Sequence, residues 1–299
     1  MKVIVTGGVG FVGTNLIKRL LKDGNEVVSL DNYSTGKKEN EQDGCKYIDV
    51  DISDSLRRHK GFGLEQYKLE KPDLIFHLGA LARIQPSLKK PASTITNNFM
   101  GTLNVLDYAR ENNIPVVYAG SSTFHHGLWG SPYAWSKHSG EQLCKLYSTI
   151  YDLPTAICRF YNVYGEHQLE DGAYATVVGI FQKLYREEKP LTVTGDGEQR
   201  RDFTHIEDIV DALIRLGWML ESNRSSKVSG QTFELGRGKN FSINELTEMF
   251  GETDVEYIPA RDGEYDYTLA NSSKAKELLG WNPTLDISDY ISEVIDDKS

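Results

Sequence analysis

Hydrophobic residues along this chain gather in short continuous runs that are rich in β-branched side chains. Such runs are typical of strands buried on both faces of a sheet, because a half-exposed strand alternates apolar and polar positions. They fall at residues 2–5, 26–30, 74–78, 116–120 and 155–159. Helical patterns separate them at residues 14–22, 64–71, 98–112 and 134–151. The alternation predicts an α/β fold, a doubly wound parallel sheet with helices on both faces.

The pattern changes after about residue 165, where polar loops at 165–172 and 195–201 separate short helices. Residues 231–235 predict one more strand, and Ser242 with Glu245 three positions later predicts a capping box that starts a helix reaching Phe250. We therefore expect a large domain and a smaller, partly discontinuous α/β domain. The large one spans 1–165 plus about 200–235, and the smaller one spans about 166–199 and 236–299.

A glycine turn follows the first predicted strand and opens the first helix. Gly7 permits a tight turn, Gly10 lets backbone N–H groups approach a pyrophosphate, and Gly13 lets helix and strand pack closely. Asp31 ends the second strand, 18 residues after Gly13, where a carboxylate would bind adenosine ribose hydroxyls and repel a 2′-phosphate. This spacing predicts a Rossmann-type dinucleotide-binding domain that prefers NAD.

A second group of residues carries candidate chemistry. Tyr133 and Lys137 lie one helical turn apart, on the same face. A phenol is a poor base at neutral pH, and a neighbouring ammonium and a positively charged nicotinamide would both lower its pKa. Ser121, Ser122 and Thr123 follow the strand at 116–120, at the sheet edge where ligands bind in such folds. A hydroxyl of this trio would bridge the reacting oxygen and the tyrosine.

Composition narrows the class of protein further. The net charge is −10 and no run of Lys and Arg stands out, which argues against nucleic acid or an anionic membrane as a partner. Three scattered cysteines and no apolar run of about 18 residues or more favour a soluble, cytoplasmic protein. His125 and His126 have no third ligand nearby in sequence, so we expect a solvated loop and no metal.

Ten stretches, in order, resemble the extended short-chain dehydrogenase/reductase family and within it the UDP-sugar 4-epimerases, over essentially the whole chain. They are TGGVGFVG, LDNYSTG, VDISD, FHLGALA, NNFMGTLNVL, SST, SPYAWSK, RFYNVYG, GDGEQRRDFTHIEDI and ARDGEYDYTLANSSKAKELLGWNP. Each stretch alone is weak evidence for the family, whereas all ten in the family's order are highly specific.

The resemblance implies roles for individual residues. The cofactor NAD would be bound by Gly7, Gly10, Phe11, Val12, Gly13, Asp31, Asn32, Asp51, Ile52, Leu78, Ala80, Ala82, Asn98, Ser121, Tyr133, Lys137 and Phe160. Catalysis would rest on Thr123, on Tyr133 as general base and on Lys137. The nucleotide sugar would meet Thr123, Asn162, Arg201, Arg261, Glu264 and Thr268.

The implied activity is that of an isomerase, a nucleotide-sugar 4-epimerase acting on UDP-glucose and galactose or their N-acetylated counterparts. It would form a transient 4-keto-sugar and return the hydride from NADH. A homodimer through the helices near 98–112 and 134–151 is also implied. A 4,6-dehydratase is the main alternative, but it needs an acid pair where Thr123 is followed by Phe124-His125-His126. An NAD-sensing binding protein usually lacks Tyr-x-x-x-Lys, and net NADH consumption would mark a reductase.

Several positions bear on the sugar. Only nine residues separate Thr123 from Tyr133, where many family members carry a loop about twice as long, so the pocket is either more open or roofed by Trp129. Thr268 falls at a family position beside the sugar and is small enough to admit an N-acetyl group. Arg83 is a candidate for meeting a uronate carboxylate, so UDP-glucuronate stays open.

Overall fold

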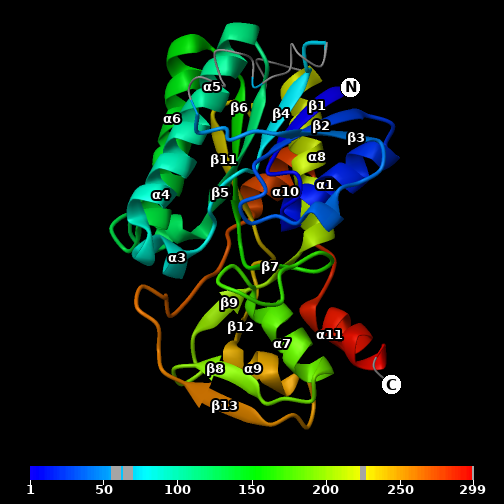
Figure 1. The fold of residues 1–299 in the computed structure, drawn as a ribbon, viewed down its shortest axis with the longest axis vertical. Coiled ribbons are helices and arrows are strands. Elements are labelled where there is room, and N and C mark those ends of the chain that lie inside the picture. The colour runs from blue at the N-terminus through cyan, green and yellow to red at the C-terminus, as the bar shows by residue number, and fades with distance from the viewer. Residues whose placement is uncertain (55–61, 63–69, 223–226, 298–299) are drawn as a thin grey trace.

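A computed structural model describes residues 1–54, 62, 70–222 and 227–297. The helix expected at 64–71 lies almost wholly outside these residues. Within the described part, seven parallel strands form one sheet in the order β11-β6-β5-β4-β1-β2-β3 (Figure 1). The strands are β1 (Lys2–Thr6), β2 (Glu26–Asp31), β3 (Cys45–Asp49), β4 (Leu74–His77), β5 (Val116–Ser121), β6 (Thr155–Phe160) and β11 (Gln231–Leu235).

The five apolar runs and the strand expected at 231–235 all lie in this sheet, so the doubly wound parallel fold is confirmed. The edge strand β3 was not expected from the hydrophobic pattern. Of its five residues only Ile48 is buried, because an edge strand has one neighbour and keeps its polar side chains in water.

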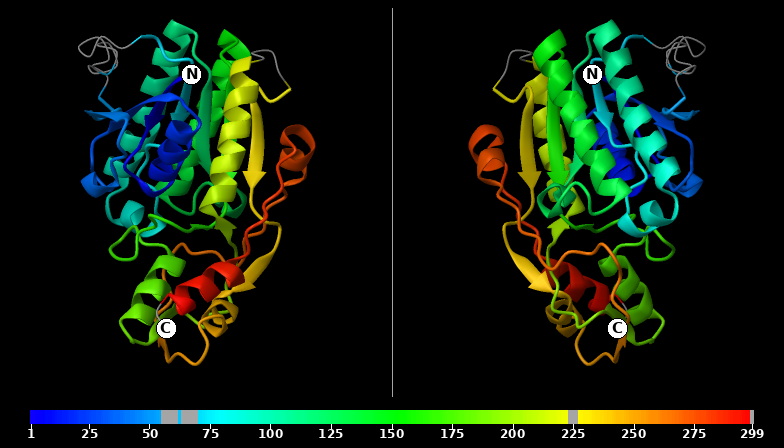
Figure 2. Two further views of the ribbon diagram at one scale, coloured as in Figure 1. Left: turned by 90° about the vertical axis from the view of Figure 1, so that its right-hand side faces the viewer. Right: turned by 90° about the vertical axis from the view of Figure 1, so that its left-hand side faces the viewer.

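Helices cover both faces of the sheet (Figures 1 and 2). On one face α1 (Phe11–Lys22) and α8 (Ile206–Ser222) pack against β1 side chains such as Val3 and Val5. On the other face α5 (Gly101–Asn112) and α6 (Pro132–Tyr151) pack against Ile4 and its neighbours. Adjacent β1 residues therefore enter opposite layers of the core, which explains the unbroken apolar runs.

The region before α5 is helical from residue 84, earlier than the pattern at 98–112 indicates. It consists of α3 (Ile84–Lys89), α4 (Pro91–Ile95) and a π-helical turn at Thr96–Met100 that leads directly into α5. None of the described helices is both long enough and apolar enough to cross a membrane.

A second group of elements lies beyond the carboxyl ends of the sheet strands (Figure 1). Its strands are β7 (Val163–Tyr164), β8 (Leu191–Thr194), β9 (Arg200–Asp202), β10 (Thr204–His205), β12 (Asn240–Ser242) and β13 (Val255–Ile258), and its helices are α7 (Val177–Arg186), α9 (Ile243–Glu248) and α11 (Ile287–Asp296). They share a core that includes Phe181, Leu191 and Leu246. The capping box is confirmed: Ser242 Oγ accepts from Glu245 N at 3.0 Å, and Ser242 N donates to Glu245 Oε2 at 2.7 Å.

One segment of the expected smaller domain packs elsewhere. Helix α10 (Ser273–Leu279) contributes Ala275 and Leu279 to the core around α8, next to β11. Trp281 joins the same core and its Nε1 donates to Asp208 O at 2.8 Å. The chain therefore returns to the sheet layer after residue 270 before it ends in α11.

Candidate active site

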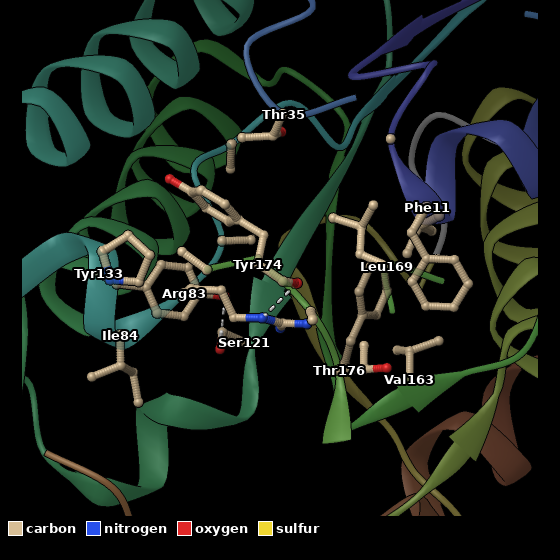
Figure 3. A pocket seen from close by; sticks show the side chains of 18 of the residues that line it. Phe11, Thr35, Arg83, Ile84, Ser121, Tyr133, Val163, Leu169, Tyr174 and Thr176 are labelled. Atoms are coloured by element: carbon tan, nitrogen blue, oxygen red, sulfur yellow. Dashed lines mark hydrogen bonds between the residues drawn. The ribbon is translucent and has the colours of Figure 1, made fainter. Parts of the chain in front are cut away.

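A cavity of about 800 Å³ opens at the carboxyl ends of the sheet strands and extends to the second group of elements (Figure 3). This is the edge at which open α/β sheets bind ligands. The cavity is lined by 21 of the 23 residues expected to bind cofactor or substrate or to act in catalysis, all but Asp51 and Asn98. Residues as far apart in the sequence as Gly7 and Thr268 thus meet in one place.

The glycine turn leaves no room for side chains. Gly7 has φ +72°, and a Cβ added there would lie 2.8 Å from the Gly79 Cα. A Cβ on Gly13 would lie 2.1 Å from the Gly7 carbonyl oxygen, where helix α1 crosses β1. The turn and the start of α1 therefore present bare backbone to the cavity, which is what a pyrophosphate needs.

The Asp31 carboxylate is fixed at the end of β2. Its Oδ2 accepts from Val9 N at 3.1 Å and its Oδ1 accepts from Tyr33 N at 2.8 Å. Burial raises the pKa of Asp31, while these backbone hydrogen bonds lower it. The glycine turn, the carboxylate and the adjoining Asn32 fit the pyrophosphate and adenosine ribose of NAD.

Two expected cofactor residues lie outside the cavity lining. Asp51 Oδ1 accepts from both Ser53 N and Ser53 Oγ, at 2.8 and 2.7 Å. Asn98 is buried, with its Oδ1 accepting from Leu81 N at 2.8 Å and its Nδ2 donating to Ser136 Oγ at 2.9 Å. Asn98 therefore holds the turn after β4 in place, a supporting role that the π-helical turn makes possible by directing this side chain inward.

Three hydroxyl groups meet at the end of β5. Tyr133 Oη donates to Ser121 Oγ at 3.4 Å, and Thr123 Oγ1 donates to the same oxygen at 3.0 Å. Ser131 Oγ accepts from Ala134 N at 3.1 Å and so caps helix α6 two residues before Tyr133. Of the trio at 121–123, Ser121 is the hydroxyl that joins the tyrosine to the threonine.

The charges around the phenol differ from the expectation. Burial raises the pKa of Tyr133, and the hydrogen bond to Ser121 and the positive charge of Arg83 oppose the increase. Lys137 Nζ donates to Ala119 O at 2.6 Å, and burial lowers the pKa of Lys137 to about 8. The cation that favours the phenolate in this structure is therefore Arg83, because the Lys137 ammonium is directed at a backbone carbonyl.

The residues expected at the nucleotide sugar converge at the far end of the cavity. Glu264 lies between two arginines, with Oε2 at 4.0 Å from Arg201 Nη2 and Oε1 at 3.8 Å from Arg261 Nη1. Asn162 Nδ2 donates to Thr268 Oγ1 at 3.1 Å, so these two side chains support each other. Two guanidinium groups at one end of a cavity suit a diphosphate.

A buried ion-pair network behind the catalytic turn was not expected. Arg159 binds Glu141 through two nitrogens, Nε to Oε1 at 3.0 Å and Nη2 to Oε2 at 2.7 Å. The Arg159 guanidinium lies 3.3 Å from the centre of the Phe124 ring, and its Nη1 is 3.6 Å from Glu234 Oε1. His125 Nε2 also pairs with Glu234 Oε1.

His125 is exposed, in line with a solvated loop, and its side chain also pairs with Glu234 of β11. The sequence does contain a signal that Glu141 is buried, because Lys137, Glu141 and Cys144 repeat on one helical face of α6. Trp129 does not roof the cavity, since it is 86% exposed and is not one of the lining residues. A segment that the motifs did not indicate lines the cavity instead, with Leu169, Tyr174 and Thr176.

The glycine turn with its acidic partner, together with the joined tyrosine and serine-threonine hydroxyls, defines an enzyme of the short-chain dehydrogenase/reductase class. The chain belongs to the NAD dependent epimerase/dehydratase family, whose model matches residues 3–236. It is accordingly an NAD-dependent enzyme.

Relatives and solved structures show which members of this family the chain is similar to. The UDP-glucose 4-epimerase of Mycolicibacterium smegmatis is 31% identical over 321 residues, which cover 99% of this chain and 98% of the relative. The structure of Thermotoga maritima UDP-glucose 4-epimerase with UDP-glucose has a TM-score of 0.89 at 26% identity, covering 99% of this chain and 98% of that one. UDP-glucuronic acid 4-epimerase from Bacillus cereus, solved with UDP-glucuronic acid and NAD, has a TM-score of 0.83 at 28% identity, covering 100% and 99%. The proteins so named are isomerases.

Proposed function

We propose that this protein is a UDP-sugar 4-epimerase. The observation that carries the proposal is the placement of Tyr133 and Thr123 on the shared Ser121 oxygen, in the cavity that Arg201 and Arg261 enter from its far end. A nucleoside diphosphate anchored by the arginines would bring its sugar to the tyrosine. The relatives that span the whole chain, named UDP-glucose and UDP-glucuronate 4-epimerases, support the same reaction.

The chain's own residues have distinct tasks in this reaction. Tyr133 removes the proton from the sugar 4-hydroxyl and later returns it, while Thr123 and Ser121 hold that oxygen and the phenol in line. Arg83 supplies positive charge near the phenol, Lys137 holds the end of β5 through Ala119 O, and the buried walls exclude water. NAD, when bound, accepts a hydride from the sugar and gives it back. Because the arginines hold the diphosphate and few groups hold the sugar, the sugar can present its other face.

The lining of the cavity favours epimerisation over elimination. A 4,6-dehydratase needs a further acid and base beside the catalytic threonine. Among the described lining residues the carboxylates are Asp31, at the cofactor end, and Glu264, between the two arginines. Phe124, which follows Thr123, packs under Arg159 and offers no such group.

Replacing Tyr133 with Phe tests the proposal. We expect kcat for interconversion of UDP-glucose and UDP-galactose to fall by about 10²-fold to 10⁴-fold, because the general base is removed while its ring remains. Sugar-resolved NMR measures the turnover, and absorbance of the released nucleotide measures bound NAD, which should be unchanged. Tyr257→Phe, which changes an exposed tyrosine outside the cavity lining, is the control. Full turnover by the Tyr133 variant would refute the assignment.

The size of the sugar pocket remains a separate proposal. Thr268 is buried and its Oγ1 accepts from Asp202 N at 3.1 Å, so it adds little volume beside Asn162. An N-acetylated sugar would therefore fit as a substrate, and the NMR assay above extends to UDP-N-acetylglucosamine.

We also propose a homodimer built on α5 and α6. Leu146, Ile150 and Tyr151 of α6 are at least half exposed, a large apolar area for one helix. Tyr147 Oη donates to Asp107 Oδ1 at 2.8 Å and fixes the two helices side by side. Light scattering should give twice the chain mass, and Ile150→Glu should halve it.

We likewise propose which domain binds which ligand. Residues 1–165 with about 200–235 would bind NAD, and about 166–199 with 236–299, apart from α10, would bind the nucleotide sugar.

A further inference from the structure

Arg83 occupies an unusual place in the cavity. It precedes α3, at the end of the turn that follows β4, and its side chain lies between Tyr133 and Thr176 (Figure 3). Its Nε donates to the backbone carbonyl of Tyr174 at 3.1 Å. This single bond fixes the guanidinium in the part of the cavity that Tyr133 and Ser121 also line.

Within the described part of the chain, Arg83 forms no ion pair, and the Nε bond is its one hydrogen bond. The two carboxylates in the described lining are engaged elsewhere, Asp31 by backbone N–H groups and Glu264 by the pair of arginines. A guanidinium has five N–H donors, so the terminal nitrogens keep theirs for a partner. Arg83 is partly buried, so water solvates its charge incompletely, and an anionic ligand group would compensate that charge.

The anion must belong to the sugar rather than to a phosphate. The glycine turn at residues 7–13 suits the pyrophosphate of the cofactor, and Arg201 with Arg261 suits the diphosphate of the substrate. Arg83 and Tyr133 lie close together among the lining side chains (Figure 3), and the positive charge of Arg83 opposes the increase in the pKa of Tyr133. A group that meets Arg83 therefore lies beside the sugar 4-hydroxyl when that hydroxyl faces Tyr133.

Carbohydrate chemistry identifies the group. In a hexopyranose, C6 is attached to C5, the ring carbon next to C4, so only three bonds separate C6 from the 4-oxygen. A carboxylate at C6 presents two oxygens in a plane, which the guanidinium fork matches with two parallel hydrogen bonds. We propose that Arg83 is a specificity-determining residue that binds the carboxylate of a UDP-linked hexuronate. The proposal rests on the 4-epimerase function proposed above.

A different role for Arg83 predicts different behaviour. If Arg83 served only to favour the Tyr133 phenolate, its loss would slow charged and neutral sugars equally and move the pH profile to higher pH. If it also binds a carboxylate, its loss affects the uronate more than a neutral sugar, because a neutral sugar has no carboxylate to lose its partner.

The experiment compares UDP-glucuronate with UDP-glucose in the holoenzyme, with wild type, Arg83→Gln and Arg83→Lys, by sugar-resolved NMR across pH 6 to 9. We expect the wild type to prefer the uronate. Arg83→Gln should slow both sugars by a common factor in kcat, because Arg83 also favours the phenolate, and should lose about 100-fold more in kcat/KM for UDP-glucuronate than for UDP-glucose, mainly through KM. Arg83→Lys should recover part of the loss. Arg215→Gln, which changes an exposed arginine on α8, is the matched control.

Three results would overturn the proposal. Equal loss on both sugars with an alkaline shift would assign Arg83 to the phenol instead. Epimerisation of UDP-glucose with no preference for the uronate would refute the carboxylate site and leave the 4-epimerase function intact. Conversion of neither sugar by protein that retains NAD would refute the 4-epimerase function and the carboxylate site together.

Discussion

Replacing Glu141 with Gln should destabilise the protein by about 3 kcal/mol. Glu141 and Arg159 form a bidentate pair whose side chains are 1% and 7% exposed. Breaking a buried pair by neutralising one partner typically costs about 3 to 5 kcal/mol, because the other charge is left without compensation. Glu234, with Oε1 at 3.6 Å from Arg159 Nη1, compensates partly, which places the cost at the lower end.

The loss of stability corresponds to a lower melting temperature. At about 2.1 cal/mol/K per residue, a chain of 299 residues has an unfolding entropy of about 0.6 kcal/mol/K, so the loss lowers Tm by about 5 °C. Differential scanning fluorimetry at one fixed NAD concentration measures it. Asp211→Asn breaks the exposed Asp211–Arg215 pair on α8 and should change Tm by less than about 2 °C.

A double variant sharpens the test. Glu141→Leu with Arg159→Met removes both charges and keeps the volume apolar, so it should cost less than Glu141→Gln alone. If Glu141→Gln melted within 1 °C of wild type, the network behind the catalytic turn would not be the strong interaction that its geometry indicates.

Three further predictions follow from other sites. Burial lowers the pKa of His77 to about 3, against 6.5 in the unfolded chain, so proton binding favours the unfolded chain. Acidification from pH 7.5 to 5 should therefore lower the free energy of unfolding by about 2 kcal/mol. His77→Gln should flatten that part of a curve of stability against pH. Gly13→Ala places a Cβ 2.1 Å from Gly7 O and should abolish NAD retention, measured by absorbance, whereas Gly24→Ala meets no atom within 4 Å and should retain NAD. Asp31→Asn removes the charge that repels a 2′-phosphate, so calorimetry should show the preference for NAD over NADP falling about tenfold.

The central sheet and the ends of its strands could be predicted because each strand is buried on both faces. Residues 231–235 were predicted despite their distance in sequence from the rest of the sheet, since Phe233 and Leu235 are apolar and buried. Strand β3 and the two-residue and three-residue strands of the second group escaped prediction. Their register depends on neighbours far along the chain, such as β12 on β9, rather than on any local pattern.

Candidate residues could be located where a motif sits at the end of a buried strand. The glycine turn and Asp31 line the cavity for that reason, as do Ser121 and Thr123, whereas Tyr133 lines it from the first turn of α6. The network of Glu141 and Arg159 could not be predicted as a pair, because the two residues come from different elements, α6 and β6, and meet only after the layers pack. The same holds for Arg83 and Tyr174, which approach across the cavity.

The late position of α8 and β11 in the chain has a consequence for synthesis on the ribosome. Helix α1 buries its apolar side against α8, which begins at Ile206, and β6 acquires its outer neighbour only with β11 at 231–235. At about 5 to 20 residues per second, α1 and one face of the growing sheet wait roughly 10 to 40 s for cover. During that interval an apolar layer and a bare strand edge face solvent or a chaperone. Nascent chains stalled before residue 206 should therefore aggregate or be retained by chaperones, whereas chains stalled well beyond residue 235 should not.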